Sequence, residues 1–109
     1  MGISKTEHFT EEQNEVAKFM KALSHPARIA IVEYLLSVDS CICNDIVDEI
    51  KLAQPTVSQH LKELKNAGII QGEIDGKAIC YCINPDTLKK MEHFISEIFR
   101  KIEKQKSCC

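Results

Sequence analysis

The residues of this chain with the most distinctive chemistry are six cysteines that fall into three close pairs. The pairs are Cys41 with Cys43, Cys80 with Cys82, and Cys108 with Cys109. The N-terminus has no apolar segment of the kind found in secretory signals, so we expect a cytoplasmic protein whose thiols are kept reduced. Grouped thiolates in that compartment are typical of soft-ion sites and of redox sites, whereas an incidental cysteine is often a small buried hydrophobic residue. The pairs therefore predict metal or redox chemistry.

The spacing of the pairs limits how they can share an ion. Residues two apart on a helix do not face each other, so Cys41 and Cys43 can hold one ion together only where the helix start is distorted or unwound. A further thiolate is best supplied by the C-terminal cysteine pair, which follows the last predicted helix and can also form a separate site. Residues two apart on a strand lie about 7 Å apart on one face, so Cys80 and Cys82 are second candidates for ligation, with a structural or redox role as the alternative.

Length and composition are those of one ordinary globular domain. The chain has 109 residues, of which 44% are hydrophobic and 28% charged, and we expect a single domain over residues 1–109 with a flexible tail at 105–109. No apolar stretch approaches the ~20 residues of a membrane-spanning helix, so we expect no membrane partner. The formal charge of −2 divides into −5 over residues 1–50, +2 over 51–90 and +1 over 91–109. A DNA-binding function must therefore rest on a local surface rather than on bulk charge.

Hydrophobic periodicity and turn signals predict four helices, a β-hairpin and a last helix. Thr10 and Gln13 fit a capping box, Pro26 fits a first helical position, and Asp75-Gly76 is a strong hairpin signal. The expected elements are helices at about 11–22, 26–37, 43–49, 54–67 and 86–104, and strands at about 69–74 and 78–83. This order predicts a mainly α winged helix-turn-helix, in which the third and fourth helices form the helix-turn-helix and the small β-hairpin forms the wing.

The fourth predicted helix has the pattern of a DNA-reading helix. Val57, Leu61 and Leu64 recur at helical spacing and must face the core. Hydroxyl, amide and lysine side chains on the remaining surface are groups that contact phosphates and base edges in the major groove, although an ordinary solvated face has a similar composition. The candidate DNA-binding residues are Gln54, Thr56, Ser58, Gln59, His60, Lys62 and Lys65, with Lys77 at the hairpin tip.

A hydrophobic stripe runs along the last predicted helix. Its residues recur at intervals of three and four, as in a coiled-coil seam. Because so small a core cannot easily cover this stripe, we expect a homodimer through the first and last helices, with a purely intramolecular core as the alternative. The expected interface comprises Val16, Phe19, Leu88, Met91, Ile95, Ile98 and Ile102.

Several linked segments resemble one family of bacterial regulators. They are Lys21-Ala-Leu-Ser-His-Pro-Ala-Arg28, Gln54-Pro-Thr-Val-Ser-Gln-His-Leu-Lys-Glu-Leu64, Ala67-Gly-Ile-Ile70 and Gly76-Lys77. The resemblance covers about residues 14–100 and is to the ArsR/SmtB family of winged-helix repressors, specifically the repressors of arsenical-resistance operons. It implies a homodimer whose two recognition helices bind a palindromic operator in double-stranded DNA, and which releases the DNA when it senses a metal or metalloid.

The first cysteine pair carries a second resemblance. Cys41-Ile-Cys43-Asn-Asp45 is similar to the C-V-C-D motif of the family's arsenite, antimonite, cadmium and lead sensors. The chain also departs from the family, because the position of a third cysteine is Ile46 and the N-terminal arm, which supplies cysteines in cadmium-type relatives, offers only His8. The zinc-ligand pairs on the last helix of other members are not reproduced over residues 85–101.

The function predicted by these motifs is transcriptional repression that is lifted when As(III) or Sb(III) binds to cysteine thiolates. Cd(II) and Pb(II) are alternative inducers, and a thiol-redox or persulfide switch would keep the same fold and the same DNA site. A metal-buffering or protein-interaction module is a different class, which sequence-specific DNA binding would exclude. No phosphate-binding loop, zinc-protease motif or nucleophile elbow occurs, so we expect neither an enzyme nor an organic cofactor.

Overall fold

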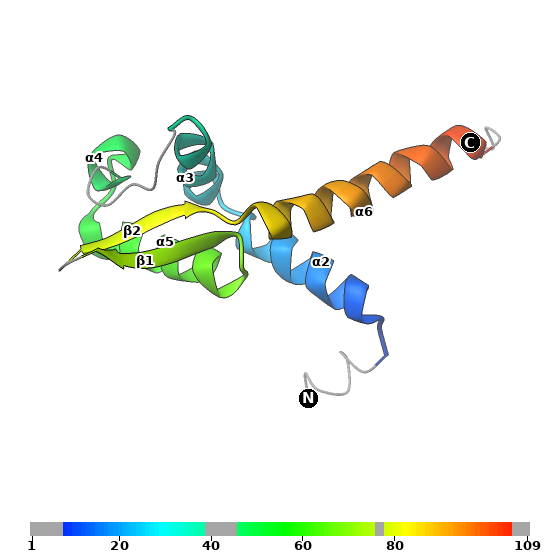
Figure 1. Cartoon of the computed structure of the whole chain (residues 1–109), viewed down its shortest axis with the longest axis horizontal. Helices are drawn as coiled ribbons and strands as arrows, with labels where there is room; N and C mark the ends of the chain where they lie inside the picture. Colours follow the sequence, from blue (N-terminus) through cyan, green and yellow to red (C-terminus); the bar gives the residue numbers. More distant parts are fainter. Residues whose placement is uncertain (1–7, 39–45, 76–77, 106–109) are drawn as a thin grey trace.

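The computed structural model describes residues 8–38, 46–75 and 78–105. Its elements are α2 (Glu11–Ala22), α3 (Pro26–Leu36), α4 (Ile46–Ile50), α5 (Gln54–Asn66), β1 (Ile70–Asp75), β2 (Ala78–Ile83) and α6 (Pro85–Lys104) (Figure 1). The order and type of these elements confirm the predicted mainly helical winged helix-turn-helix. The start of the helix expected from Cys43 and most of the tail expected to be flexible lie outside the described residues.

Local side chains set the helix ends as the sequence predicts. The hydroxyl of Thr10 accepts from the backbone N–H of Gln13, and the Gln13 side chain accepts from the backbone N–H of Thr10, both at 3.0 Å, which completes the capping box. The side chain of Asn84 accepts from the N–H of Asp86 at 3.1 Å and so caps α6. These bonds satisfy N–H groups that have no partner within the helix.

Helix α5 ends in a tight turn that leads directly into the β1–β2 hairpin, which forms the wing. Gly68 has a φ of +76°, in the left-handed region that favours glycine, and a Cβ there would come within 3.3 Å of the Thr87 hydroxyl. The antiparallel hairpin then pairs Ile70 with Ile83 and Asp75 with Ala78. The chain therefore cannot continue α5, and the wing starts beside the end of that helix.

A single core holds α5 against the rest of the domain. The most deeply buried side chains are Ile31, Val57, Leu64, Ile69 and Ile70. They come from α3, α5, the turn after α5, and β1, while Ile46 at the start of α4 joins the same core. Burial of aliphatic side chains of this size contributes roughly 1.5–3 kcal/mol each. This packing fixes which face of α5 points to solvent.

Part of the predicted dimer interface is buried within the protomer. Val16 and Phe19 of α2 and Met91 of α6 lie in one hydrophobic core of the protomer. Leu88 is partly buried against the same core. These positions belong to the hydrophobic core of the protomer, and their part in a dimer interface stays a prediction.

The distal half of α6 is different. It projects away from the domain (Figure 1) and gives the protomer an elongated shape of 54 × 35 × 23 Å. Four large apolar side chains on it are 40–62% exposed: Ile95, Ile98, Phe99 and Ile102. Among the described helices, none combines the length and the apolar character that crossing a membrane requires.

Candidate nucleic-acid interface

The solvent-facing side of α5 carries most of the predicted DNA-binding residues. Exposed side chains on it are Gln54, Thr56, Ser58, Gln59, Lys62 and Lys65. The helix also starts without a side-chain cap, since Ala53 occupies the N-cap position and makes no such bond. Unpaired N–H groups at a helix N-terminus attract phosphate, so the backbone of the first turn is a further candidate for a phosphate contact. Lys77 lies outside the described residues.

Two side-chain hydrogen bonds order this face. The amide of Gln54 donates to the Ser58 hydroxyl at 2.9 Å, and the amide of Gln59 donates to a carboxylate oxygen of Glu63 at 3.1 Å. Each bond joins residues one turn apart along the exposed surface. The polar groups are therefore already aligned along the helix, and on DNA they can exchange these exposed bonds for bonds to base edges at little cost.

His60 does not belong to this face. Its place in the sequence predicts a DNA-binding residue, but His60 is only 7% exposed and lies on the core side of α5. Its Nδ1 accepts a hydrogen bond from Nε of Arg28 at 3.1 Å, and its ring centroid lies 4.5 Å from that of His25. Arg28 also donates from Nη1 to the carbonyl of Ala22 at 3.2 Å. The imidazole therefore ties the recognition helix to the junction between α2 and α3.

This position keeps His60 neutral. Burial lowers the pKa of its imidazole below the ordinary value, and the charges of His25 and Arg28 lower it further. Only the neutral imidazole has a ring nitrogen that can accept from Arg28, since both nitrogens of the protonated form are donors. Protonation would thus both break the bond to Arg28 and place a second cation beside it.

The lowered pKa of His60 predicts a pH-dependent stability. Between the folded-state pKa and the ordinary value of about 6.5, the unfolded chain binds a proton at His60 that the folded chain does not. The free energy of unfolding should therefore fall as the pH is lowered from about 7.5 to about 5.5. His60→Gln, whose amide oxygen can still accept from Arg28, should lose much of this dependence in urea denaturation. The exposed His93→Gln is the control, and an unchanged slope in His60→Gln would contradict the assignment.

The described residues do not bring together a metal site. Among residues 8–38, 46–75 and 78–105, no three His, Cys, Asp or Glu side chains form a group that could hold an ion. The predicted ligands outside these ranges are Cys41, Cys43, Cys108 and Cys109. Cys80 and Cys82 lie on β2, opposite Glu73 and Gln71 of β1. Cys80 is buried and disulfide-bonded.

The arrangement of α3, α4, α5 and the hairpin defines the class of protein. The helix-turn-helix of α4 and α5 packs against α3, the β1–β2 wing follows directly, and α5 turns an ordered polar face to solvent. A helix with these properties is the element that enters the major groove in winged helix-turn-helix proteins. The fold and the site are therefore those of a DNA-binding protein of this class.

Comparison with known proteins identifies the family. Residues 25–71 match the family model described as bacterial regulatory protein, arsR family. The chain is 36% identical over 89 residues to the uncharacterized HTH-type transcriptional regulator MJ1325 of Methanocaldococcus jannaschii, which covers 81% of this chain and 99% of that protein. It is 37% identical to the cadmium resistance transcriptional regulatory protein CadC homolog of Staphylococcus aureus, over 71% of this chain and 64% of the relative.

A solved structure supports the same assignment. The crystal structure of the transcriptional repressor BigR from Xylella fastidiosa superposes with a TM-score of 0.61 at 30% identity, covering 82% of this chain and 90% of that one. The chain belongs to the ArsR family of winged helix-turn-helix proteins. It is a DNA-binding transcriptional regulator and not an enzyme.

Proposed function

We propose that this protein is a homodimeric repressor that binds a palindromic operator in double-stranded DNA and leaves it when As(III) or Sb(III) binds to its cysteine thiolates. The observation that carries the DNA-binding part is the ordered, solvent-facing polar surface of α5, which the core holds in place. The relative BigR, described as a transcriptional repressor, supports repression as the direction of control. The proposed site of action is the cytoplasm.

In this proposal, Ser58 and Gln59 contact base edges, because they lie in the middle of the exposed face where a groove floor is closest. The amine groups of Lys62 and Lys65 and the hydroxyl of Thr56 contact phosphates, which position the helix without reading sequence. Gln54 supports Ser58 through their hydrogen bond, and Lys77 contacts an adjacent phosphate from the wing.

The homodimer brings two recognition helices to one operator. The exposed apolar side chains on the distal half of α6 provide the surface, and α2 lies beside the proximal half of the same helix. A two-fold axis through this surface places the two α5 helices in successive major grooves, so the operator is palindromic.

The proposed inducer site centres on Cys41 and Cys43, with Cys108 and Cys109 as donors of further thiolates. The position of this pair supports the proposal. Cys43 lies three residues before Ile46, whose side chain is in the core, and α4 packs against both α3 and α5. An ion that draws thiolates together at this point would pull on the start of α4 and shift the recognition helix it supports. Soft thiolates match the thiophilic ions As(III) and Sb(III).

Two alternative inducers each have a specific support. Cd(II) or Pb(II) suits the same thiolates, and a relative of this chain is described as a cadmium resistance regulatory protein. The disulfide bond at Cys80 on the wing supports a thiol-redox or persulfide switch as the other alternative. All three versions use the same DNA interface.

The test is fluorescence anisotropy of the reduced protein on a duplex taken from upstream of its own gene, with arsenite added under anaerobic conditions. Release at about one ion per protomer supports the proposal. Tight binding that arsenite does not disturb would exclude arsenic, and additions of Cd(II), Pb(II) and polysulfide to the same complex would then separate the alternatives. Binding to the duplex no tighter than to a scrambled duplex would exclude the repressor function itself.

The first cysteine pair can be tested by substitution. Cys41→Ser and Cys43→Ser should each bind the operator with unchanged affinity but fail to release it at arsenite concentrations that free the wild type, because a serine hydroxyl is a poor ligand for a soft ion. Cys82→Ser is the matched control on the wing and should release normally. Normal release by Cys41→Ser and Cys43→Ser would remove this pair from the mechanism.

A further inference from the structure

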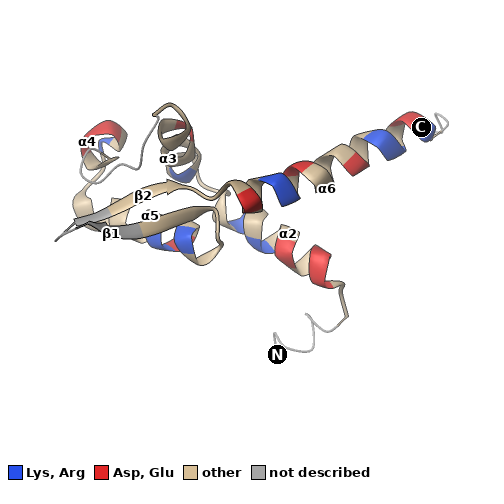
Figure 2. Ribbon diagram, viewed as in Figure 1, with Lys and Arg blue, Asp and Glu red and all other residues tan. Residues whose placement is uncertain are grey.

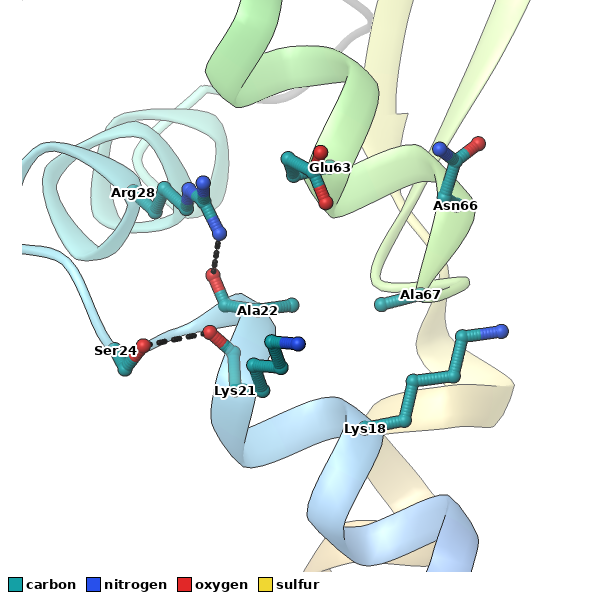
Figure 3. A pocket seen from close by; sticks show the side chains of 8 residues that line it. All are labelled: Lys18, Lys21, Ala22, Ser24, Arg28, Glu63, Asn66 and Ala67. Atoms are coloured by element: carbon teal, nitrogen blue, oxygen red, sulfur yellow. Dashed lines mark hydrogen bonds between the residues drawn. The ribbon is translucent and has the colours of Figure 1, made fainter. Parts of the chain in front are cut away.

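A cavity of about 520 Å³ opens where the end of α2, the start of α3 and the last turns of α5 meet (Figure 3). Its lining side chains are Lys18, Lys21, Ala22, Ser24, Arg28, Glu63, Asn66 and Ala67. Three of these are cations and one is a carboxylate, so the cavity has a formal charge of +2 in a chain whose net charge is −2. Its described lining residues include none of the side chains proposed to read bases.

The one carboxylate of the cavity does not neutralise the cations. Glu63 accepts its hydrogen bond from Gln59 on the exposed face of α5 rather than from a cation. Within the part of the chain that the structure describes, the only ion pair within 4.0 Å joins Glu97 and Arg100 on α6, remote from this cavity. The positive charge of the cavity is therefore available to an anion.

One of the three cations is fixed in position. Arg28 donates from Nη1 to the Ala22 carbonyl and from Nε to the neutral imidazole of His60, which leaves its guanidinium oriented but without a carboxylate. Lys18 and Lys21 are exposed, and both extend from α2 toward the cavity (Figure 3). An oriented guanidinium together with two ammonium groups suits a polyvalent oxyanion. The planar guanidinium positions the oxyanion through paired N–H donors, and the lysines add positive charge.

We propose that this cavity binds a phosphate group. A phosphate monoester carries between one and two negative charges at neutral pH, and a backbone phosphodiester carries one; both offer several oxygens to a guanidinium and two ammonium groups. The phosphate can belong to the DNA backbone or to a small molecule. Two observations favour the DNA backbone as the source. Glu63 and Asn66, which form one wall of the cavity, belong to α5, the helix that carries the proposed DNA-binding face. On α2, the basic residues lie in the C-terminal half, which lines the cavity, and the acidic residues lie in the N-terminal half (Figure 2).

The first experiment uses the DNA-free protein and inorganic phosphate at constant ionic strength, followed by NMR chemical shifts or calorimetry. Lys18→Gln/Lys21→Gln should bind phosphate about tenfold more weakly than wild type. Glu63→Gln should bind it about threefold more tightly, since it removes the only negative charge of the cavity. Lys101→Gln/Lys104→Gln on α6 removes the same charge elsewhere and should behave as wild type. These lysines are exposed, so folding is retained.

The second experiment measures duplex affinity against salt concentration for the same proteins. If the DNA backbone is the source, Lys18→Gln/Lys21→Gln lowers the slope of log K against log salt by about 1 for each lost contact, on operator and scrambled duplex alike. Loss of phosphate binding with an unchanged slope assigns the cavity to a small phosphate ligand. Equal behaviour of wild type, cavity variant and control in both experiments overturns the proposal.

This inference rests on the proposed function only for the DNA arm. If the wild type fails to prefer its operator over a scrambled duplex, the repressor proposal fails while the phosphate titration still decides the cavity. If the operator is bound specifically but both arms show no effect of the lysines, the cavity proposal fails alone.

Discussion

Replacing Ile95 by aspartate is expected to convert the protein from a dimer into a folded monomer and to weaken operator binding about 1,000-fold or more. Ile95 is 40% exposed in the protomer and lies on the apolar face of the distal half of α6, where no other described element covers it. In the dimer each aspartate would be desolvated without a partner and would face its symmetry mate, which costs several kcal/mol per dimer. A monomer can bind only one half of the palindromic operator, so the affinity gained from binding both halves at once is lost.

Sedimentation at several protein concentrations measures the first effect, and circular dichroism checks that the fold is retained. Ser96→Asp adds the same charge to the same helix away from the apolar face and should remain a dimer. Because Ile102 lies further from the core and is 54% exposed, Ile102→Asp provides a second variant in which folding is less at risk. A dimeric Ile95→Asp protein would show that another surface joins the protomers.

Much of the fold could be predicted because local signals and tertiary packing agree. The capping box at Thr10 and the side chain of Asn84 satisfy helix-start N–H groups, and Pro26 has no N–H that needs a partner, regardless of distant contacts. The periodicity of Val57, Leu61 and Leu64 likewise defines the face of α5 that must be buried. These features depend on residues within a few positions of each other, and the structure confirms them.

The role of the apolar stripe could not be resolved from its spacing alone. Met91 and Ile95 occupy equivalent positions on one helical face, yet the first is buried in the protomer and the second is exposed. The difference arises because α2 and the winged domain cover only the proximal turns of α6, and the amount of α6 that extends beyond them is a property of the assembled fold.

The burial of His60 and the basic cavity could not be predicted from the sequence, because both depend on residues that are far apart along the chain. His60 follows the polar residue Gln59 and precedes the core residue Leu61, so composition allows either face. Its burial is set by Arg28, which is 32 positions away in sequence and supplies the bond that makes a buried imidazole acceptable. Lys18 and Glu63 likewise line the same cavity only because α2 and α5 come together in the folded chain.

Replacing Ser58 and Gln59 together by alanine is expected to weaken operator binding about 100-fold or more while leaving stability unchanged. Each well-placed contact to a base edge is worth roughly 1–3 kcal/mol of discrimination, and a symmetric dimer loses it in both half-sites. Both side chains are exposed, and alanine is a better helix former than serine, so the double substitution should not disturb α5. The hydrogen bonds to Gln54 and Glu63 that it removes are exposed and contribute little to stability.

Anisotropy titrations on operator and scrambled duplexes distinguish the loss of base contacts from the loss of phosphate contacts. For the double variant, affinity for the operator should fall toward that for the scrambled duplex, while the scrambled value and the salt slope stay near wild type, because neither side chain carries charge. Lys62→Gln is the contrasting variant, since loss of a phosphate contact should weaken both duplexes equally and lower the salt slope. Ser96→Ala on α6 is the inert control. Equal operator affinity in the double variant and the wild type would mean that α5 meets the groove through a different face, most directly through the backbone of its uncapped first turn.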